Sequence, residues 1–453
     1  MNSINPATGE QIASYDPMSD QQAEQIIEAA HQRFKTWRKT TFQERATFMR
    51  RCAELLRERK GKLGLLMTEE MGKLVREAEG EVEKCAWVCE YYADNAEGFL
   101  QNESIETEMS RSFITYQPIG VVLAVMPWNF PLWQVFRFAA PALMAGNVGV
   151  LKHASNVCGC ALAIEEVIAD AGFPENCFRT LLIPSKQVER VIQNPLVRAV
   201  TLTGSVPAGA AVAAAAGKEL KKTVLELGGS DPYVVLEDAD LKLAAQKCTQ
   251  SRLLNAGQSC IAAKRFIVVE KVYDAFVEAF VEEMKSKKVG DPKAEGIDLG
   301  PQASTDLRDE LHQQVKDSVA KGAVCKLGGE LPDGPGAFYP PTVLIDVTPG
   351  MPAYDEELFG PVASVIKVAD VEEAVRVAND SEFGLGGAVF TGDVERGLRL
   401  AAEEIDTGFC AVNDFVKSDP RLPFGGVKKS GYGRELSYLG IREFVNIKTV
   451  TTP

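Results

Sequence analysis

Three side chains of the sequence have the types needed for covalent catalysis by a thiol. Cys260 ends the stretch GQSC (257–260), whose small residues let a substrate approach closely. Glu226 ends an apolar stretch and precedes two glycines, and a carboxylate in such a setting can act as a general base. Asn129, in PWNFP (127–131), can present its amide to a developing oxyanion. Together they predict a nucleophile, a base and an oxyanion donor.

Glu226 and His153 are the two candidates for the base that removes the proton of Cys260. Lys264 and Arg265 follow the thiol closely, and nearby positive charge favours the thiolate. A Cys–His pair is the alternative, because His153 follows a predicted strand, although the chain has only 3 histidines. We expect Glu226 rather than His153 to act as the base.

Other motifs indicate ligand binding. The turn TLTGSVPAGAAVAAAAG places Ser205 between a predicted strand and an alanine-rich helix, where backbone N–H groups can hold a phosphate. It lacks the GxGxxG spacing, so a tight structural turn remains the alternative. Arg137 follows Asn129 by eight residues in an apolar predicted helix, and on its own it reads as an ordinary ion pair. Two glycine-rich loops, FGPV and LPFGGVKKSGYGRE, are typical of backbone that approaches a ligand.

Alternating strands and helices must position these residues. Residues 20–100 predict amphipathic helices, the first capped at Ser19. From residue 121 short apolar strands alternate with helices, which predicts a parallel sheet with helical crossovers, and a second such pattern runs from about 230 to 425. The C-terminal segment REFVNIKTVTTP predicts a strand.

Composition excludes several classes of protein. The 453 residues carry a formal net charge of −14, which argues against nucleic acid or an anionic membrane as the main partner. The longest apolar runs are far shorter than a membrane span, and the N-terminal residues do not resemble a signal peptide. The 10 cysteines show neither a dense disulfide framework nor the spacing of a metal site, so we expect no metal and a cytoplasmic location.

Six motifs in order along the chain resemble the aldehyde dehydrogenase superfamily: PWNFP (127–131), TGS (203–205), ELGG (226–229), GQSC (257–260), EELFGPV (356–362) and PFGGVKKSGYGRE (423–435). The resemblance covers almost the whole chain and implies an α/β fold. A Rossmann-type cofactor domain would comprise residues 1–99 and 119–227, and an α/β catalytic domain residues 228–430. A small β element for oligomerisation would combine residues 100–118 and 431–453.

The resemblance also implies roles for individual residues. Cys260 would attack the aldehyde carbon, Asn129 and the Cys260 N–H would hold the oxyanion, and Glu226 would activate the water that hydrolyses the thioester. The positions that would contact the nicotinamide cofactor are Trp128, Lys152, Ser155, Ser205, Glu357 and Phe359. Many NAD-using relatives have a glutamate where this chain has Ser155. Because a carboxylate there repels a 2′-phosphate, its loss predicts that NADP is preferred, with NAD still usable.

The segments PWNFPLWQVFRFAAPALMAGN and VNDFVKSDPRLPFGG look like bacterial succinate-semialdehyde dehydrogenases. By that resemblance Arg137 would bind the distal carboxylate of the substrate, and Ser418 would assist it. Many relatives have a second arginine where this chain has Leu254, and the nearest arginine is Arg252. A second cysteine that some relatives use in a disulfide switch is replaced by Ala262, so we expect no such switch here.

Three alternatives remain open at this point. Glutarate semialdehyde, which is one methylene longer, is a second candidate substrate because a methylene gives little selectivity. A coenzyme A-acylating dehydrogenase would use a thiol in place of water, although the presence of Glu226 favours hydrolysis. A catalytically idle binding protein of the same fold is the third, and the three intact residues Cys260, Glu226 and Asn129 argue against it.

Strands that reach out of the body need a partner, which predicts a homodimer or a tetramer made of dimers.

Overall fold

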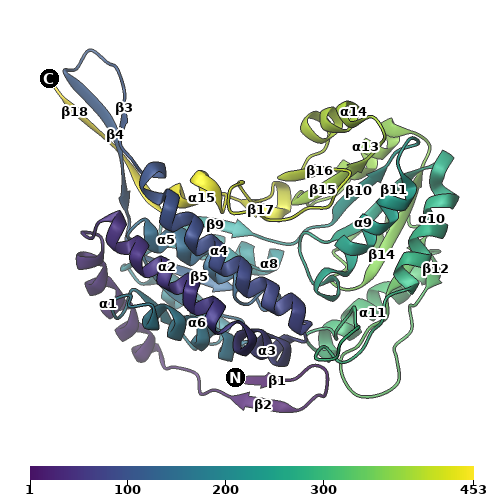
Figure 1. The fold of residues 1–453 in the computed structure, drawn as a ribbon, viewed down its shortest axis with the longest axis horizontal. Helices are drawn as coiled ribbons and strands as arrows, with labels where there is room; N and C mark the ends of the chain where they lie inside the picture. Colours follow the sequence, from purple (N-terminus) through teal and green to yellow (C-terminus); the bar gives the residue numbers. More distant parts are fainter.

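Two β-sheets form the centres of two lobes in the computed structural model, which describes residues 1–453 (Figure 1). The first sheet has six strands in the order β17-β9-β8-β5-β6-β7. All neighbours in it are parallel except β17 and β9. Its strands are β5 (Val121–Met126), β6 (Val148–His153), β7 (Phe178–Thr180), β8 (Val197–Thr203), β9 (Lys222–Glu226) and β17 (Gly431–Tyr432).

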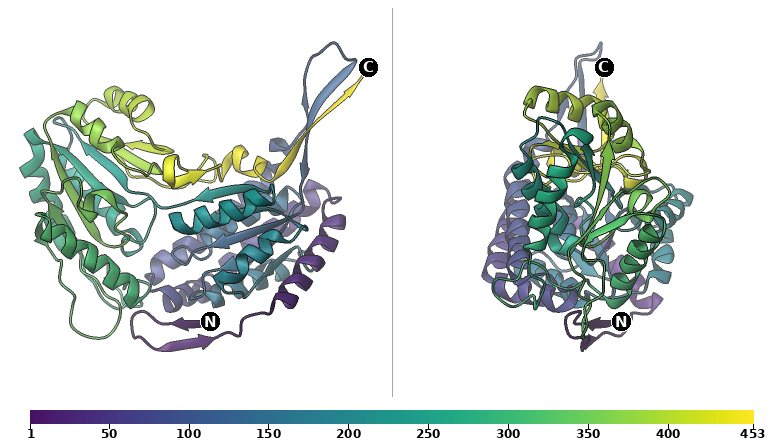
Figure 2. Two further views of the ribbon diagram at one scale, coloured as in Figure 1. Left: turned by 180° about the vertical axis from the view of Figure 1, so that it is seen from behind. Right: turned by 90° about the vertical axis from the view of Figure 1, so that its right-hand side faces the viewer.

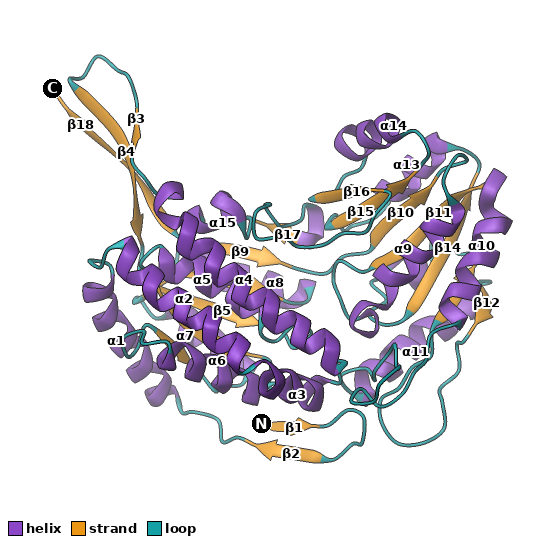
Figure 3. Ribbon diagram, viewed as in Figure 1, coloured by secondary structure: helices purple, strands orange, loops and turns teal.

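Helices cover this first sheet, as the alternating sequence pattern predicts (Figure 3). The N-terminal layer contains α1 (Asp20–Trp37), α2 (Phe42–Glu58), α3 (Lys60–Met71) and α4 (Val75–Phe99). Between the strands run α5 (Trp133–Met144), α6 (Cys158–Asp170), η1 (Ser185–Gln187), α7 (Val188–Gln193) and α8 (Val206–Lys218). The predicted cap of α1 is present, since Ser19 accepts from the Gln22 N–H and Gln22 accepts from the Ser19 N–H.

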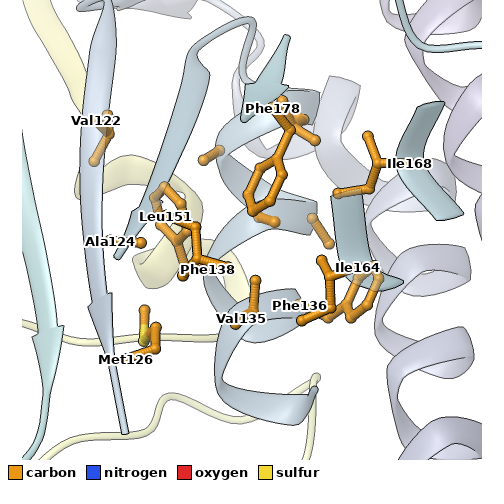
Figure 4. Packing of buried hydrophobic residues seen from close by; sticks show 14 of the residues in the cluster. Val122, Ala124, Met126, Val135, Phe136, Phe138, Leu151, Ile164, Ile168 and Phe178 are labelled. Carbon is orange, nitrogen blue, oxygen red and sulfur yellow. The ribbon is translucent and has the colours of Figure 1, made fainter. Parts of the chain in front are cut away.

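The packing of β5 against α5 fixes the turn that carries Asn129. Side chains alternate between the two faces of a strand, so Val122 and Met126 lie on the same side of β5 (Figure 4). They belong to one continuous core with Val135 and Phe138 of α5. Every residue of α5 is buried, which holds the PWNFP turn between two rigid elements.

The second sheet has seven strands in the order β12-β13-β14-β11-β10-β15-β16. Only β12 runs antiparallel to its neighbour. The strands are β10 (Asp231–Val235), β11 (Ala263–Val269), β12 (Val324–Leu327), β13 (Thr342–Ile345), β14 (Val362–Val368), β15 (Gly386–Phe390) and β16 (Phe409–Val412). Its helices are α9 (Leu241–Leu253), η2 (Leu254–Gly257), α10 (Glu270–Lys285), α11 (Thr305–Ala320), α12 (Pro352–Asp355), α13 (Val371–Asn379), α14 (Val394–Arg399) and the π-helical η3 (Leu400–Glu404).

An arm of three strands extends beyond the two lobes (Figures 1 and 2). It consists of β18 (Val445–Thr452), β4 (Arg111–Pro118) and β3 (Glu103–Ser104), with β4 in the middle. Residues 431–444 do not belong to the arm, because β17 pairs with β9 and α15 (Ser437–Arg442) packs against the body. The projecting C-terminal part therefore begins at Val445 rather than at residue 431. The remaining elements are β1 (Asn2–Ile4), β2 (Gln11–Ser14) and η4 (Lys428–Ser430). None of the helices combines the length and the apolar character that crossing a bilayer requires.

Candidate active site

A strained loop between α9 and β11 carries Cys260. Three consecutive residues, Asn255, Ala256 and Gly257, have φ values of 55°, 53° and 78°. This left-handed region is unfavourable for alanine, and such strain is retained mainly where the surrounding structure enforces it. Gly257 lies directly against Gly360, and a Cβ on Gly257 would overlap the Gly360 backbone. The GQSC loop therefore packs directly against the FGPV loop, which explains the glycine at 257, whereas a Cβ on Gly360 would overlap Leu311.

Two hydrogen-bond donors of this region are suited to an oxyanion. Gln134 Nε2 donates to Asn129 Oδ1 at 3.1 Å and fixes the orientation of the Asn129 amide. Asn129 Nδ2 then donates one hydrogen to the Gln258 carbonyl at 3.0 Å, which leaves its second hydrogen free. The Cys260 N–H donates to no protein acceptor. Asn129 and Cys260 line the same cavity, so both donors are available where a carbonyl oxygen would be polarised.

The Cys260 thiol is held in its protonated form. Burial raises its pKa to about 12, and the positive charges of Lys264 and Arg137 offset this only in part. Lys264 Nζ lies close by and donates to the Cys260 carbonyl at 2.7 Å. Arg265, which we expected near the thiol, points away and donates to the carbonyls of Ser230 and Ala378. Of the basic pair, only Lys264 therefore contributes at the site.

Cys260 lies where two cavities meet. The first, of about 290 Å³, is lined by five of the residues predicted to bind the cofactor or the oxyanion. These five are Trp128, Asn129, Ser205, Glu357 and Phe359. The second, of about 230 Å³, is lined by Arg137 and Ser418, the two residues predicted to bind the substrate carboxylate. A thiol with a separate space on each side can meet two different molecules.

The first cavity has features suited to the nicotinamide and pyrophosphate parts of a dinucleotide. Ser205 is the N-cap of α8, its side chain makes no capping bond, and the helix begins there with free N–H groups suited to a phosphate. The rings of Trp128 and Phe359 meet edge to face, with centroids 5.8 Å apart. Glu357 accepts from the Gly229 N–H at 3.1 Å and pairs with Lys264 at 3.2 Å, which fixes its carboxylate at the cavity wall. A Cβ on Gly228 would overlap that carboxylate, so the glycines of ELGG allow this approach.

Lys152 and Ser155 lie outside both cavities. Lys152, at the end of β6, donates to the Ser185 hydroxyl at 3.4 Å, and burial lowers its pKa. The Ser155 carbonyl accepts from the Cys158 thiol. Their roles toward the adenosine end of the cofactor stay predictions.

Glu226 lies at the end of β9, buried, and lines neither cavity. Neither of its carboxylate oxygens has a hydrogen-bond partner. Burial and the neighbouring carboxyl of Glu435 raise the pKa of Glu226 well above its ordinary value. Gly425 of the PFGG motif adjoins it, since a Cβ there would lie 2.7 Å from Glu226 Oε1. A carboxylate without partners and with a raised pKa has the chemistry of a general base, and it must turn to reach the thiol.

His153 does not provide a base. Its two ring nitrogens contact the backbone carbonyls of Met126 and Pro131, at 3.2 and 2.8 Å. Burial lowers its pKa to about 4, and it lines neither cavity. The structure therefore disfavours a Cys–His pair.

Arg137 and Ser418, the two residues predicted to bind the substrate carboxylate in the second cavity, each contact protein groups that the sequence did not predict. Arg137 forms a buried ion pair with Glu435, and its guanidinium also donates to Thr203 at 3.3 Å. Ser418 forms no hydrogen bond with Arg137 and instead accepts from Lys84 Nζ at 2.6 Å. Leu254 lines the cavity, as its position in the sequence implies. Arg252 instead donates to the Gly257 carbonyl at 2.6 Å and does not replace the missing arginine.

Sequence reasoning missed several residues of the site. Gln134 lies inside a motif that was noted, and its spacing of five from Asn129 could have indicated the contact. Glu435 ends a quoted motif, but nothing in that motif indicates its contact with Arg137. Lys84 and α11, which lines the first cavity through Leu307 and Glu310, give no comparable signal. No group of three or more His, Cys, Asp or Glu side chains is arranged to hold a metal ion.

The two lobes, the projecting arm and a cysteine between two cavities, the first bordered by a helix N-terminus suited to a phosphate, define an aldehyde dehydrogenase. Residues 1–450 match the Aldehyde dehydrogenase family, and the chain belongs to it, which confirms the expected fold.

Similar proteins are known in bacteria. A protein of Mycolicibacterium paratuberculosis named succinate-semialdehyde dehydrogenase [NADP(+)] is 53% identical over 451 residues, which cover 99% of this chain and 95% of that protein. A probable enzyme of the same name from Synechocystis is 51% identical over 447 residues, covering 99% and 98%. The crystal structure of succinic semialdehyde dehydrogenase from Streptococcus pyogenes in complex with NADP+ superposes with a TM-score of 0.98 at 43% identity, covering 100% of this chain and 99% of that one.

Proposed function

We propose that this protein oxidises succinate semialdehyde to succinate with NADP+. The observation that carries the proposal is the position of Cys260 between the first cavity, which fits the cofactor, and the second, which contains Arg137. The relatives from Mycolicibacterium and Synechocystis carry the name of this activity. The structural relative from Streptococcus pyogenes binds NADP+.

The geometry supports a covalent route. The Cys260 thiol gives its proton to Glu226, which turns toward it and then releases the proton to water, and the sulfur attacks the aldehyde carbon. The electron pair of the C=O bond moves to its oxygen, and Asn129 Nδ2 and the Cys260 N–H hold the oxyanion. The residues that line the first cavity would hold NADP+, and its nicotinamide would supply the hydride acceptor needed to oxidise the thiohemiacetal to a thioester. Glu226 turns toward the thioester and takes a proton from water, whose oxygen attacks the acyl carbon and releases the thiol and succinate.

Recognition of the cofactor follows from the first cavity and the segment beyond β6. Ser205 and the N-terminus of α8 hold the pyrophosphate, Trp128 and Phe359 border the nicotinamide end, and Glu357 binds its ribose. Ser155 takes the place of a repelling carboxylate, and Lys152 adds positive charge near the 2′-phosphate. NADP is therefore preferred over NAD.

Two further proposals concern the cell and the assembly. We place the enzyme in the cytoplasm, and this is supported by 10 cysteines that are all free thiols, since a reducing compartment keeps Cys260 in its active form. We also propose a homodimer or a tetramer of dimers, supported by the projecting arm.

Steady-state kinetics with a panel of aldehydes tests the function. We expect kcat/KM for succinate semialdehyde to exceed that for butanal by at least about 100-fold, because a carboxylate bound by a buried cation is a strong contact. NADP should be preferred to NAD. A higher value for glutarate semialdehyde would reassign the substrate, and acceleration by coenzyme A with formation of succinyl-coenzyme A would reassign the acceptor. No turnover of any aldehyde would leave a binding protein.

A further inference from the structure

The second cavity contains one ammonium group without a carboxylate partner. It belongs to Lys84 of α4, a half-buried side chain that lines the cavity together with Glu77 and Glu81 of the same helix. Every other cation that lines the cavity is paired: Lys73 with Glu81, Arg137 with Glu435, and Lys417 with Asp414. Glu77 also lines the cavity and accepts from the Asn255 N–H without forming an ion pair. Lys84 is therefore the one cation of the lining that is not already paired and can meet an incoming anion.

The contacts of Lys84 leave it able to bind an anion. Its Nζ donates to Ser418 Oγ at 2.6 Å and lies 4.3 Å from the centre of the Trp133 ring. An ammonium has three hydrogens to donate, and only this one has an acceptor. Because Ser418 accepts from Lys84, its own hydroxyl hydrogen is free to donate as well. A half-buried cation without a carboxylate partner is unfavourable, so an anion that reached Lys84 would gain from pairing with it.

Arg137 is less suited to provide the charge alone. Its guanidinium pairs with Glu435 and donates to Thr203, and Phe424 lies 4.6 Å away against its face. The pair with Glu435 offsets its charge, so a further carboxylate meets little net attraction there. Leu254, on another wall of the cavity, has no donor.

We propose that Lys84, together with the Ser418 hydroxyl, binds the carboxylate of the substrate and so sets the specificity of the enzyme for semialdehydes with an acidic tail. This inference rests on the proposed function and assigns its carboxylate-binding group. Lys84 and Cys260 line the same cavity, so a short chain can have its aldehyde at the thiol and its carboxylate at the ammonium.

The charge of Lys84 also makes the specificity depend on pH. Burial and the positive charge of Arg137 lower its pKa to about 8, against opposing contributions from Cys85, Glu81 and Asp419. Above pH 8 Lys84 loses its proton and its attraction for a carboxylate. The ratio of kcat/KM for succinate semialdehyde to that for butanal should therefore fall as pH rises from 7 to 9.5. Steps common to both substrates, including ionisation of Cys260, cancel in this ratio.

The test compares three variants with both aldehydes. Lys84→Gln should raise KM for succinate semialdehyde by about 10-fold or more and change KM for butanal by less than about threefold, as expected for loss of a charge-assisted contact. Lys84→Arg should keep most of the specificity and remove the fall of the ratio above pH 8. Lys247→Gln is the matched control, because Lys247 is also half-buried over a ring, Phe415, but is paired with Asp414 and lies outside the cavity.

The outcomes separate this inference from the proposed function. A wild-type enzyme that does not prefer succinate semialdehyde over butanal would overturn the function itself. A wild-type preference that Lys84→Gln leaves unchanged, or equal losses for both aldehydes, would overturn the role of Lys84 alone. If Lys84→Gln has a lowered melting temperature, Lys84→Met is measured in the same way, and the Arg variant still tests the pH profile.

Discussion

At the scale of single residues, the chemistry depends on a thiol that its surroundings keep protonated. Burial of Cys260 raises its pKa to about 12, although Lys264 and Arg137 lie near enough to lower it. A raised pKa makes the thiolate rare at neutral pH and more nucleophilic once it forms. The free enzyme thus protects its nucleophile, and attack must be coupled to removal of the proton.

Alkylation of Cys260 by iodoacetamide measures this directly. Because only the thiolate reacts, the rate should rise about tenfold per pH unit from pH 7 to 10 without a plateau. Mass spectrometry of the peptide that contains Cys260 gives the rate. The same peptide in denaturant is the control and should level off near pH 8.5. A plateau below pH 9 in the folded enzyme would show that burial does not govern the thiol.

The residues found from sequence and those missed differ in a physical way. Cys260, Asn129 and Ser205 lie in turns whose small neighbours and prolines are unusual for ordinary structure, so their types and positions were informative. Lys84 lies on an amphipathic helix, where a lysine that faces a cavity has the same sequence context as one that faces water. The pair between Arg137 and Glu435 joins positions almost 300 apart, and no local pattern encodes such a contact.

At the scale of elements, η2 positions the nucleophile and the oxyanion donor together. Asn255 and Ala256 adopt left-handed conformations in a short stretch that ends only three residues before Cys260. Asn255 Nδ2 donates to the Asn129 carbonyl at 2.8 Å, so the same loop also fixes the oxyanion donor. Any shift of this loop moves the thiol and the amide together.

Gly257→Ala tests this coupling. The new Cβ would overlap the Gly360 backbone at a residue whose φ is 78°, so the loop must move. We expect kcat to fall by about 100-fold or more, as for a displacement of about 1 Å at a reacting group, and the melting temperature to fall as well. Gly98→Ala in α4 is the control, since a Cβ there meets no atom within 4 Å. It should leave kcat unchanged and raise the melting temperature slightly. Equal kcat values for the two variants would contradict the argument.

Much of the element order followed from sequence because periodicity and caps are local. The helix capped at Ser19 and the strand that begins at residue 121 form as expected. The left-handed Asn255 and Ala256 could not be predicted, because neither is glycine, the residue for which such a backbone conformation is expected. The pairing of β17 with β9 also depends on tertiary contact, since two residues carry too little pattern to define a strand.

At the scale of the whole molecule, the arm presents an open sheet edge. All eight residues of β18 pair with β4 on one side, while the order β18-β4-β3 leaves the other side of β18 without a strand. Ile447 on this strand is 61% exposed, and Ile105 and Met109 of the β3–β4 segment are also exposed. An unpaired edge of this length with apolar side chains invites pairing with another chain, and a second copy of this chain fits the proposed assembly.

Ile447→Asp should weaken that assembly. A carboxylate on the arm must lose its water when a partner covers it, which disfavours the interface. Light scattering over a range of protein concentrations should show wild-type dimers or tetramers, and for the variant a shift toward the mass of one chain at low concentration. Leu220→Asp is the control, because Leu220 is 94% exposed but lies on the body of the first lobe, so its assembly should match the wild type. An unchanged mass for Ile447→Asp, or an equal shift in both variants, would place the interface elsewhere than on the arm.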